Sequence, residues 1–161
     1  MKLPKSWLCE YVDFNVSNEE FIERMMWRGF ELAGIEKELP LEGVVVGKVL
    51  SIQKHENSDH LWVCELDVGT ETLTIVTGAQ NVSAGALVPV AVVGATLGER
   101  TMAKVTMRGV ESSGMLCSGA ELGLSEADYP GAGVDGILLL SGAHPLGQPI
   151  ETALGFDDVI F

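Results

Sequence analysis

Short runs rich in Val, Ile, Leu and Thr, separated by Gly, Asn, Ser and Pro, dominate the chain from residue 43 onward. Runs of this length with turn residues between them are typical of β-strands in a small barrel or sandwich. The expected strands cover residues 43–53, 61–68, 72–77, 87–97, 101–107 and 136–140. In the second run, alternation places Cys64 and Leu66 on one face with Trp62 and Val68, and we expect that face to be buried.

The first 40 residues follow a helical pattern instead. Ser17 is a candidate N-cap, and Glu20 three residues later completes a capping box. The apolar residues that follow share one helical face: Phe21, Ile22, Met25 and Met26. Gly29 is the expected end of this helix, and residues 6–11 suit a shorter helical turn. We interpret the methionine-rich face as core packing rather than as a cofactor site.

Composition limits the class of protein. Of 161 residues, 47% are hydrophobic and 20% are charged, which is typical of a packed globular chain. The apolar runs are too short to span a bilayer, and the N-terminal residues MKLPKSWLCEYVDF contain no signal-peptide core. Three widely spaced cysteines do not form a disulfide framework. We therefore expect a cytoplasmic protein with no membrane partner.

The net charge of −13 argues against extensive phosphate binding. Residues 41–148 carry twelve acidic and five basic side chains, so no basic block exists there. Any nucleic-acid contact must come from a few local cations and from shape. Strand alternation places Lys104 and Arg108 on one face and pairs Lys48 with Lys54, while Asn81 lies in a connecting loop next to Gln80.

Catalytic and metal sites are the alternatives. His55, His60, Cys64 and Cys117 could be combined as zinc ligands, but their spacing matches no zinc motif. Cys117 has no histidine near it in sequence, although a partner brought close by folding stays an alternative. We interpret it as a structural cysteine. The glycines match no phosphate-binding loop. We therefore predict no catalytic residue, no metal site and no cofactor in this chain.

Four ordered motifs carry a family resemblance: HENSDHLWVCELDVG (55–69), IVTGAQNV (75–82), LVPVAVVGATL (87–97) and MRGVESSGMLCSGAELGL (107–124). Together they resemble the tRNA-binding OB-fold module of bacterial phenylalanyl-tRNA synthetase β subunits. Related modules occur in methionyl-tRNA synthetases and in free-standing tRNA-binding proteins. The N-terminal residues and the segment FELAGIE are similar to the start of the β subunit.

The resemblance implies a mainly β fold with an α/β flank. Residues 41–148 would form a five-stranded OB-fold barrel of Greek-key order, inserted in a small, incomplete α/β domain made of residues 1–40 and 149–161. The chain would be an N-terminal fragment of a longer subunit. Its partners would be phenylalanine tRNA, the synthetase α subunit and the remaining β-subunit domains. ATP and Mg²⁺ would serve the full synthetase, whose aminoacylation site lies in the α subunit, so this fragment would be no enzyme alone.

Departures from the family pattern lower the expected affinity for tRNA. His60 and Ser83 stand where basic residues are frequent in the family, which removes phosphate contacts. Glu56 replaces a frequent Pro and adds a carboxylate to a turn, and Thr77 replaces a frequent Cys. The residues expected to contact RNA are Lys54, His60, Asn81, Lys104, Arg108 and Ser113. Two alternatives stay open: an architectural module that joins subunits or domains without touching RNA, and a free-standing tRNA-binding protein.

Overall fold

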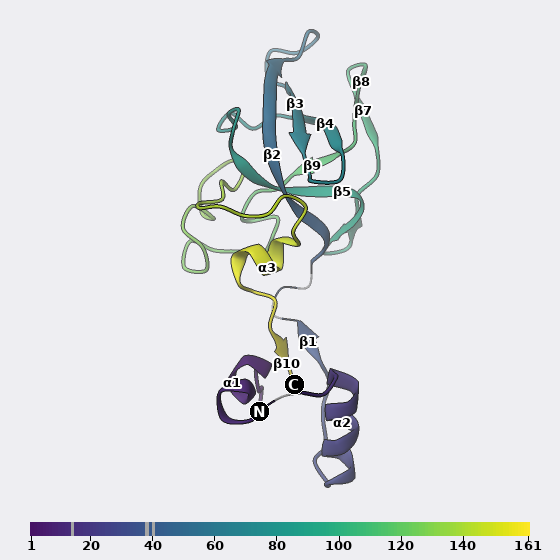
Figure 1. Cartoon of the computed structure of the whole chain (residues 1–161). Coiled ribbons are helices and arrows are strands. Elements are labelled where there is room, and N and C mark those ends of the chain that lie inside the picture. The colour runs from purple at the N-terminus through teal and green to yellow at the C-terminus, as the bar shows by residue number, and fades with distance from the viewer. Residues whose placement is uncertain (14, 38, 40) are drawn as a thin grey trace. The chain divides into compact units, whose positions relative to one another are not determined.

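A computed structural model describes residues 1–13, 15–37, 39 and 41–161 (Figure 1). The chain divides into two units. The first comprises Met1–Pro40 and Gly155–Phe161, and the second comprises Leu41–Leu154. The helix α3 (Ile150–Leu154) lies in the second unit, so the chain changes units later than the sequence-based boundary at residue 149.

Five strands form the wall of the second unit: β2 (Glu42–Lys54), β3 (Trp62–Asp67), β4 (Thr72–Thr77), β5 (Leu87–Leu97) and β9 (Gly114–Leu116). All neighbours are antiparallel, in the order β4-β3-β2-β5-β9. The backbone N–H of Ser113 donates to the carbonyl of Thr74 at 2.9 Å, which brings β9 back against β4. The sheet is therefore a nearly closed, OB-like barrel, and the expected fold class is confirmed.

The barrel interior is filled by aliphatic side chains from all five strands. Its fully buried members include Val49, Cys64, Leu66, Ile75, Val88 and Val90. Cys64 and Leu66 are buried while Glu65 between them is exposed, which confirms the alternation expected for β3. Gly114 permits β9 to approach β5 closely, because a Cβ atom there would lie 2.6 Å from the carbonyl oxygen of Ala91.

The segment after β5 differs from the single strand expected at 101–107. It divides into β6 (Arg100–Thr101) and β7 (Val105–Met107), and β7 pairs with β8 (Val110–Ser112) as a hairpin. The division arises because β6 pairs back onto the end of β5, after which the chain turns away. Residues 136–140 form no strand in the described chain, although Leu138 and Leu140 donate backbone hydrogen bonds to Cys117 and Leu87.

The first unit joins the two ends of the chain. Its helices are α1 (Lys5–Tyr11) and α2 (Asn18–Trp27), and β1 (Glu36–Lys37) pairs with β10 (Val159–Ile160). The Glu20 backbone N–H donates to Ser17 Oγ at 3.2 Å, which confirms the predicted N-cap. Among the described residues, no helix of either unit has the length and apolar character needed to cross a bilayer.

Core packing is the wrong interpretation for part of the methionine-rich face of α2. The ring of Phe21 packs on that of Phe161, with centroids 4.8 Å apart, and Met25 is half-buried. Met26, however, is 62% exposed. The prediction fails because Met25, one turn after Phe21, lines a hollow together with Phe161, whereas Met26 lines a different hollow with Ile22 and Trp27.

Candidate nucleic-acid interface

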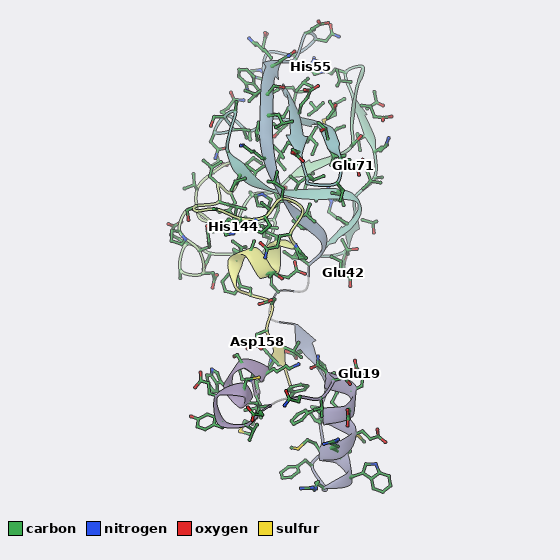
Figure 2. All side chains as sticks on the ribbon, viewed as in Figure 1. Glu19, Glu42, His55, Glu71, His144 and Asp158 are labelled. Carbon is green, nitrogen blue, oxygen red and sulfur yellow. The ribbon has the colours of Figure 1, made fainter. Side chains whose placement is uncertain are left out.

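Two loops that are distant in sequence meet at one end of the barrel. The loop of residues 55–61, here called the His55 loop, connects β2 to β3, and the hairpin β7–β8 lies in the connection from β5 to β9. In OB-fold barrels, the loops at these two places are the ones that bind oligonucleotides. Figure 2 shows His55 where β2 ends.

His55 holds the two loops together. Its side chain is buried, with the residue only 3% exposed. Its Nδ1 accepts the backbone N–H of Asn57 at 3.0 Å, and its Nε2 lies 3.1 Å from the carbonyl oxygen of Met107. Because a carbonyl only accepts, Nε2 carries the proton and the ring is fixed in one neutral tautomer. The sequence analysis considered His55 only as a possible zinc ligand, so its burial between the two loops is a finding of the structure.

Arg108, at the tip of the hairpin β7–β8, also contacts the His55 loop. It forms the two-residue turn with Gly109, and both residues have positive φ, 48° and 93°, as a type I′ hairpin turn requires. The Arg108 guanidinium donates to the Asn57 carbonyl at 3.0 Å, and the Asn57 side chain donates to the Arg108 carbonyl at 3.5 Å. We call His55, Asn57, Met107 and Arg108 the clasp.

Two further expected RNA contacts lie beside the clasp. Lys54 ends β2, and its Nζ is 3.7 Å from Asp59 in the His55 loop. His60 is an exposed member of the same loop, and its carbonyl accepts a hydrogen bond from Gln80 at 3.4 Å. Gln80 also accepts from the indole N–H of Trp62 at 3.3 Å. Lys54, His60 and Arg108 are therefore brought to one end of the barrel.

The other three expected contacts lie elsewhere. Lys104 pairs with Glu111 at 3.0 Å, and with Ser113 it lines a hollow of about 340 Å³ to which no clasp residue contributes. Figure 2 shows Glu71, another residue of that hollow, well apart from His55. Asn81 uses its carboxamide internally: it donates to the Ile137 carbonyl at 2.8 Å and accepts the Ile137 N–H at 3.0 Å.

Asn57 and Trp62 were missed by sequence reasoning. Asn57 was assigned no role, and Trp62 was assigned only to the buried face of β3. No local sequence signal identifies Asn57, because its partner Arg108 is 51 residues away along the chain.

The two cysteines considered for chemistry are buried. Burial, with the Glu121 charge nearby, raises the pKa of Cys117 to about 12, and burial raises that of Cys64 to about 11. Both are therefore protonated thiols at neutral pH, whereas nucleophiles and metal ligands need the thiolate. Within the described parts of the chain, no three His, Cys, Asp or Glu side chains gather in a way that could hold a metal ion.

Comparison with known proteins gives a consistent family signal. Residues 44–147 match the model of a putative tRNA binding domain. All of this chain is 45% identical to the phenylalanine–tRNA ligase beta subunit of Symbiobacterium thermophilum, covering 18% of that protein. A Synechococcus beta subunit is 46% identical over 99% of the chain and 20% of its own length. The chain thus spans about a fifth of the curated relatives it matches.

A solved structure, the MetRS related protein from Pyrococcus horikoshii, aligns with 65% of this chain and 85% of its own. Its sequence identity is 23% and the TM-score is 0.45.

Proposed function

The chain belongs to the putative tRNA-binding domain family, and we propose on that basis that its barrel contacts tRNA through the end that carries the clasp. It would serve as an auxiliary tRNA-binding region of a phenylalanine–tRNA ligase β subunit. Attachment of phenylalanine, with its ATP and Mg²⁺, would take place elsewhere in the synthetase. The α subunit and the rest of the β subunit would be its protein partners.

The observation that carries this proposal is the reciprocal contact between Arg108 and Asn57. It fixes a cation on one loop against the polar backbone of the other, at the place where OB barrels bind nucleic acid. A guanidinium has five N–H donors, so a single bond to Asn57 leaves others for a phosphate. Arg108 and Lys54 would meet phosphates, while Asn57 and His60 would meet sugar hydroxyls or exposed base edges.

Binding should be weak and only moderately dependent on salt. Two or three phosphate contacts release few counterions, which gives a slope of log K against log salt of roughly −2 for RNA. Lys104 and Ser113 line a hollow apart from the clasp, and both polar atoms of the Asn81 carboxamide are bonded to the Ile137 backbone, so we assign none of the three a leading role. The excess of twelve acidic over five basic residues in 41–148 favours the architectural module as the second candidate.

An anisotropy titration of the full chain with labelled phenylalanine tRNA at several salt concentrations tests the proposal. Arg108→Ala should weaken binding about three- to tenfold and make the salt slope about one unit shallower. Arg100→Ala is the matched control, because Arg100 is an exposed arginine of the same barrel outside the clasp. Absence of binding at low salt would leave only the architectural function, whereas equal losses in both variants would show that the clasp is not the tRNA contact.

A further inference from the structure

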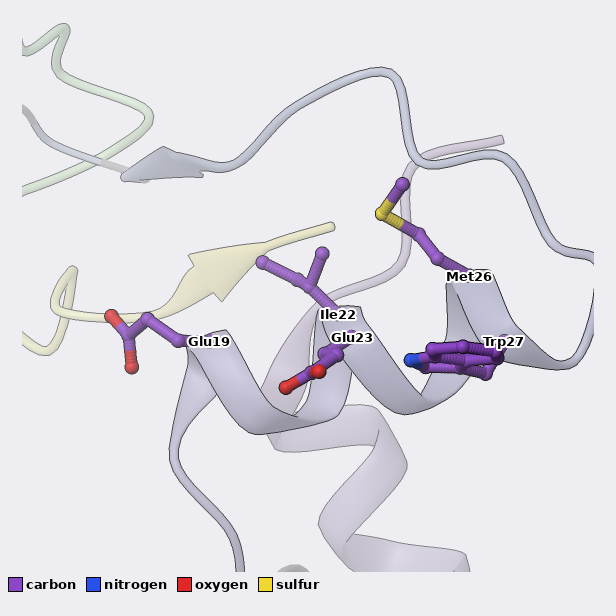
Figure 3. A pocket seen from close by; sticks show the side chains of 5 residues that line it. All are labelled: Glu19, Ile22, Glu23, Met26 and Trp27. Carbon is purple, nitrogen blue, oxygen red and sulfur yellow. The ribbon is translucent and has the colours of Figure 1, made fainter.

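The outer face of α2 presents an apolar surface bordered by carboxylates. Glu19, Ile22, Glu23, Met26 and Trp27 line a hollow of about 590 Å³ on this helix (Figure 3). Their spacing places all five on one side of a helix, one turn above another. We call these five residues the α2 face.

Much of the apolar part of the α2 face is exposed in the first unit. Trp27 is 85% exposed and Met26 is 62% exposed. Side chains of these two types are common in contacts between proteins and their partners. None of the ten residues of α2 is buried, and the helix packs inward through Phe21 on Phe161. A helix of this length depends on packing for its stability, so contact with a second apolar surface would stabilise it.

The charges on the α2 face select the kind of occupant. Glu20 is paired with Arg24, whereas Glu23 and Glu19 project from the face itself, with the Lys5 charge near Glu19. Hydrogen bonds from its own backbone amide and from Ser17 lower the pKa of Glu19, which keeps its carboxylate charged. Two carboxylates repel RNA phosphates and anionic lipid headgroups, and a second copy of the chain would bring the same two carboxylates.

We infer that the α2 face docks an amphipathic polypeptide helix that carries Lys or Arg beside its apolar stripe. Apolar side chains of this partner would cover Met26 and Trp27, and its cations would pair with Glu19 and Glu23. Recognition follows the helix-in-groove mode, in which side chains at i, i+3, i+4 and i+7 supply the anchors. The inference is independent of tRNA binding, because it involves no residue of the barrel.

Designed peptides test this inference on the full chain. The probe is a labelled Leu/Lys amphipathic helix of about 18 residues, long enough to be helical when bound. A Leu/Glu peptide of the same pattern and a scrambled Leu/Lys peptide are its controls. Anisotropy should show binding of the first peptide only. The Met26→Ser/Trp27→Ser variant should bind it about tenfold more weakly or worse, because a buried Trp is a typical anchor.

Two more variants separate packing from charge. Glu19→Gln/Glu23→Gln should weaken binding several-fold and reduce its salt dependence. Trp7→Ser is the matched control, since Trp7 is 60% exposed but lies on α1, outside the α2 face, and this variant should bind like the unaltered chain. Equal binding of the Leu/Glu or scrambled peptide, or full binding by the Met26/Trp27 variant, would overturn the inference. Self-association abolished by that double variant, seen in sedimentation, would instead assign the face to a second copy.

Discussion

Arg108 adopts a backbone conformation that few side chains favour, and the clasp maintains it. Its φ of 48° lies in the left-handed region, which costs a non-glycine residue about 1 kcal/mol. The hydrogen bonds with Asn57 offset part of that cost. A cation kept in a strained conformation by a neighbouring loop is consistent with a binding role, which stays a proposal.

Substituting Arg108 with glycine or with alanine separates the loss of the guanidinium from the strain in the backbone. Both substitutions remove the guanidinium, but only glycine also relieves the left-handed strain. We expect Arg108→Gly to be about 1 kcal/mol more stable than Arg108→Ala, while the two lose tRNA affinity equally. Urea unfolding and the tRNA titration measure the two quantities. Equal stability would show that the backbone at 108 relaxes at no cost.

The cysteines should differ sharply in reactivity. Cys9 is exposed, whereas Cys64 and Cys117 are buried thiols with raised pKa. We expect a thiol reagent at pH 8 to modify Cys9 quickly and the other two only when the barrel unfolds. Rapid modification of Cys117 in the folded chain would contradict its burial.

The same thiols predict a pH dependence of stability. An unfolded chain ionises its cysteines above about pH 8.5, whereas the folded chain keeps these two protons until their pKa values of about 11 and 12 are approached. The unfolded state therefore binds fewer protons in that interval. The free energy of unfolding should be intact below pH 8.5 and should fall as pH rises toward 11, which urea midpoints at pH 8 and pH 10 measure.

The hairpin β7–β8 and the His55 loop behave as one element because a buried imidazole joins them. Sequence patterns predicted β2 to β5 to within one or two residues, since alternation and turn residues are local signals. They did not predict β9, whose three residues begin with a glycine, nor the clasp, whose partners are about 50 residues apart. Every residue has a backbone carbonyl, so an acceptor such as Met107 cannot be recognised from its side-chain type.

Removing the imidazole should loosen the hairpin. His55→Ala removes the partner of the Met107 carbonyl and of the Asn57 N–H, at a cost of roughly 1 kcal/mol for each hydrogen bond. Trypsin should then cut after Arg108 about tenfold faster, because cleavage needs the turn to open. His144→Ala is the control, since His144 is only half-buried and its ring bonds the Ser141 carbonyl three residues away. Equal cleavage rates in the two variants would show that the hairpin is held by other contacts.

The two units differ greatly in how much apolar surface they bury. Among the described residues, Phe161 is the only buried hydrophobic side chain outside residues 41–154. Composition and the family resemblance predicted the barrel but not this difference. Neither composition nor the resemblance predicts the poor burial of the first unit, because a methionine-rich helical face is compatible with either a core or an exposed surface.

Residues 41–154 should fold on their own. Expressed alone, they should melt cooperatively within a few degrees of the barrel transition of the full chain, because the core of the barrel is contributed by its own strands. The first unit, with residues 1–40 joined to 155–161 by a short Gly-Ser linker, should show no cooperative melt in circular dichroism. A barrel that is unfolded alone would mean that its stability depends on the first unit.

The pairing of β1 with β10 has a consequence for how such a chain can change during evolution. The first unit is assembled from both ends of the chain, and the barrel occupies one uninterrupted stretch between them. A single in-frame deletion or replacement in the gene can therefore remove or exchange the whole barrel. No single deletion can remove the first unit and leave the barrel. The barrel is thus the part of this architecture that one genetic event can remove or exchange, whereas loss of the first unit needs changes on both sides of the barrel.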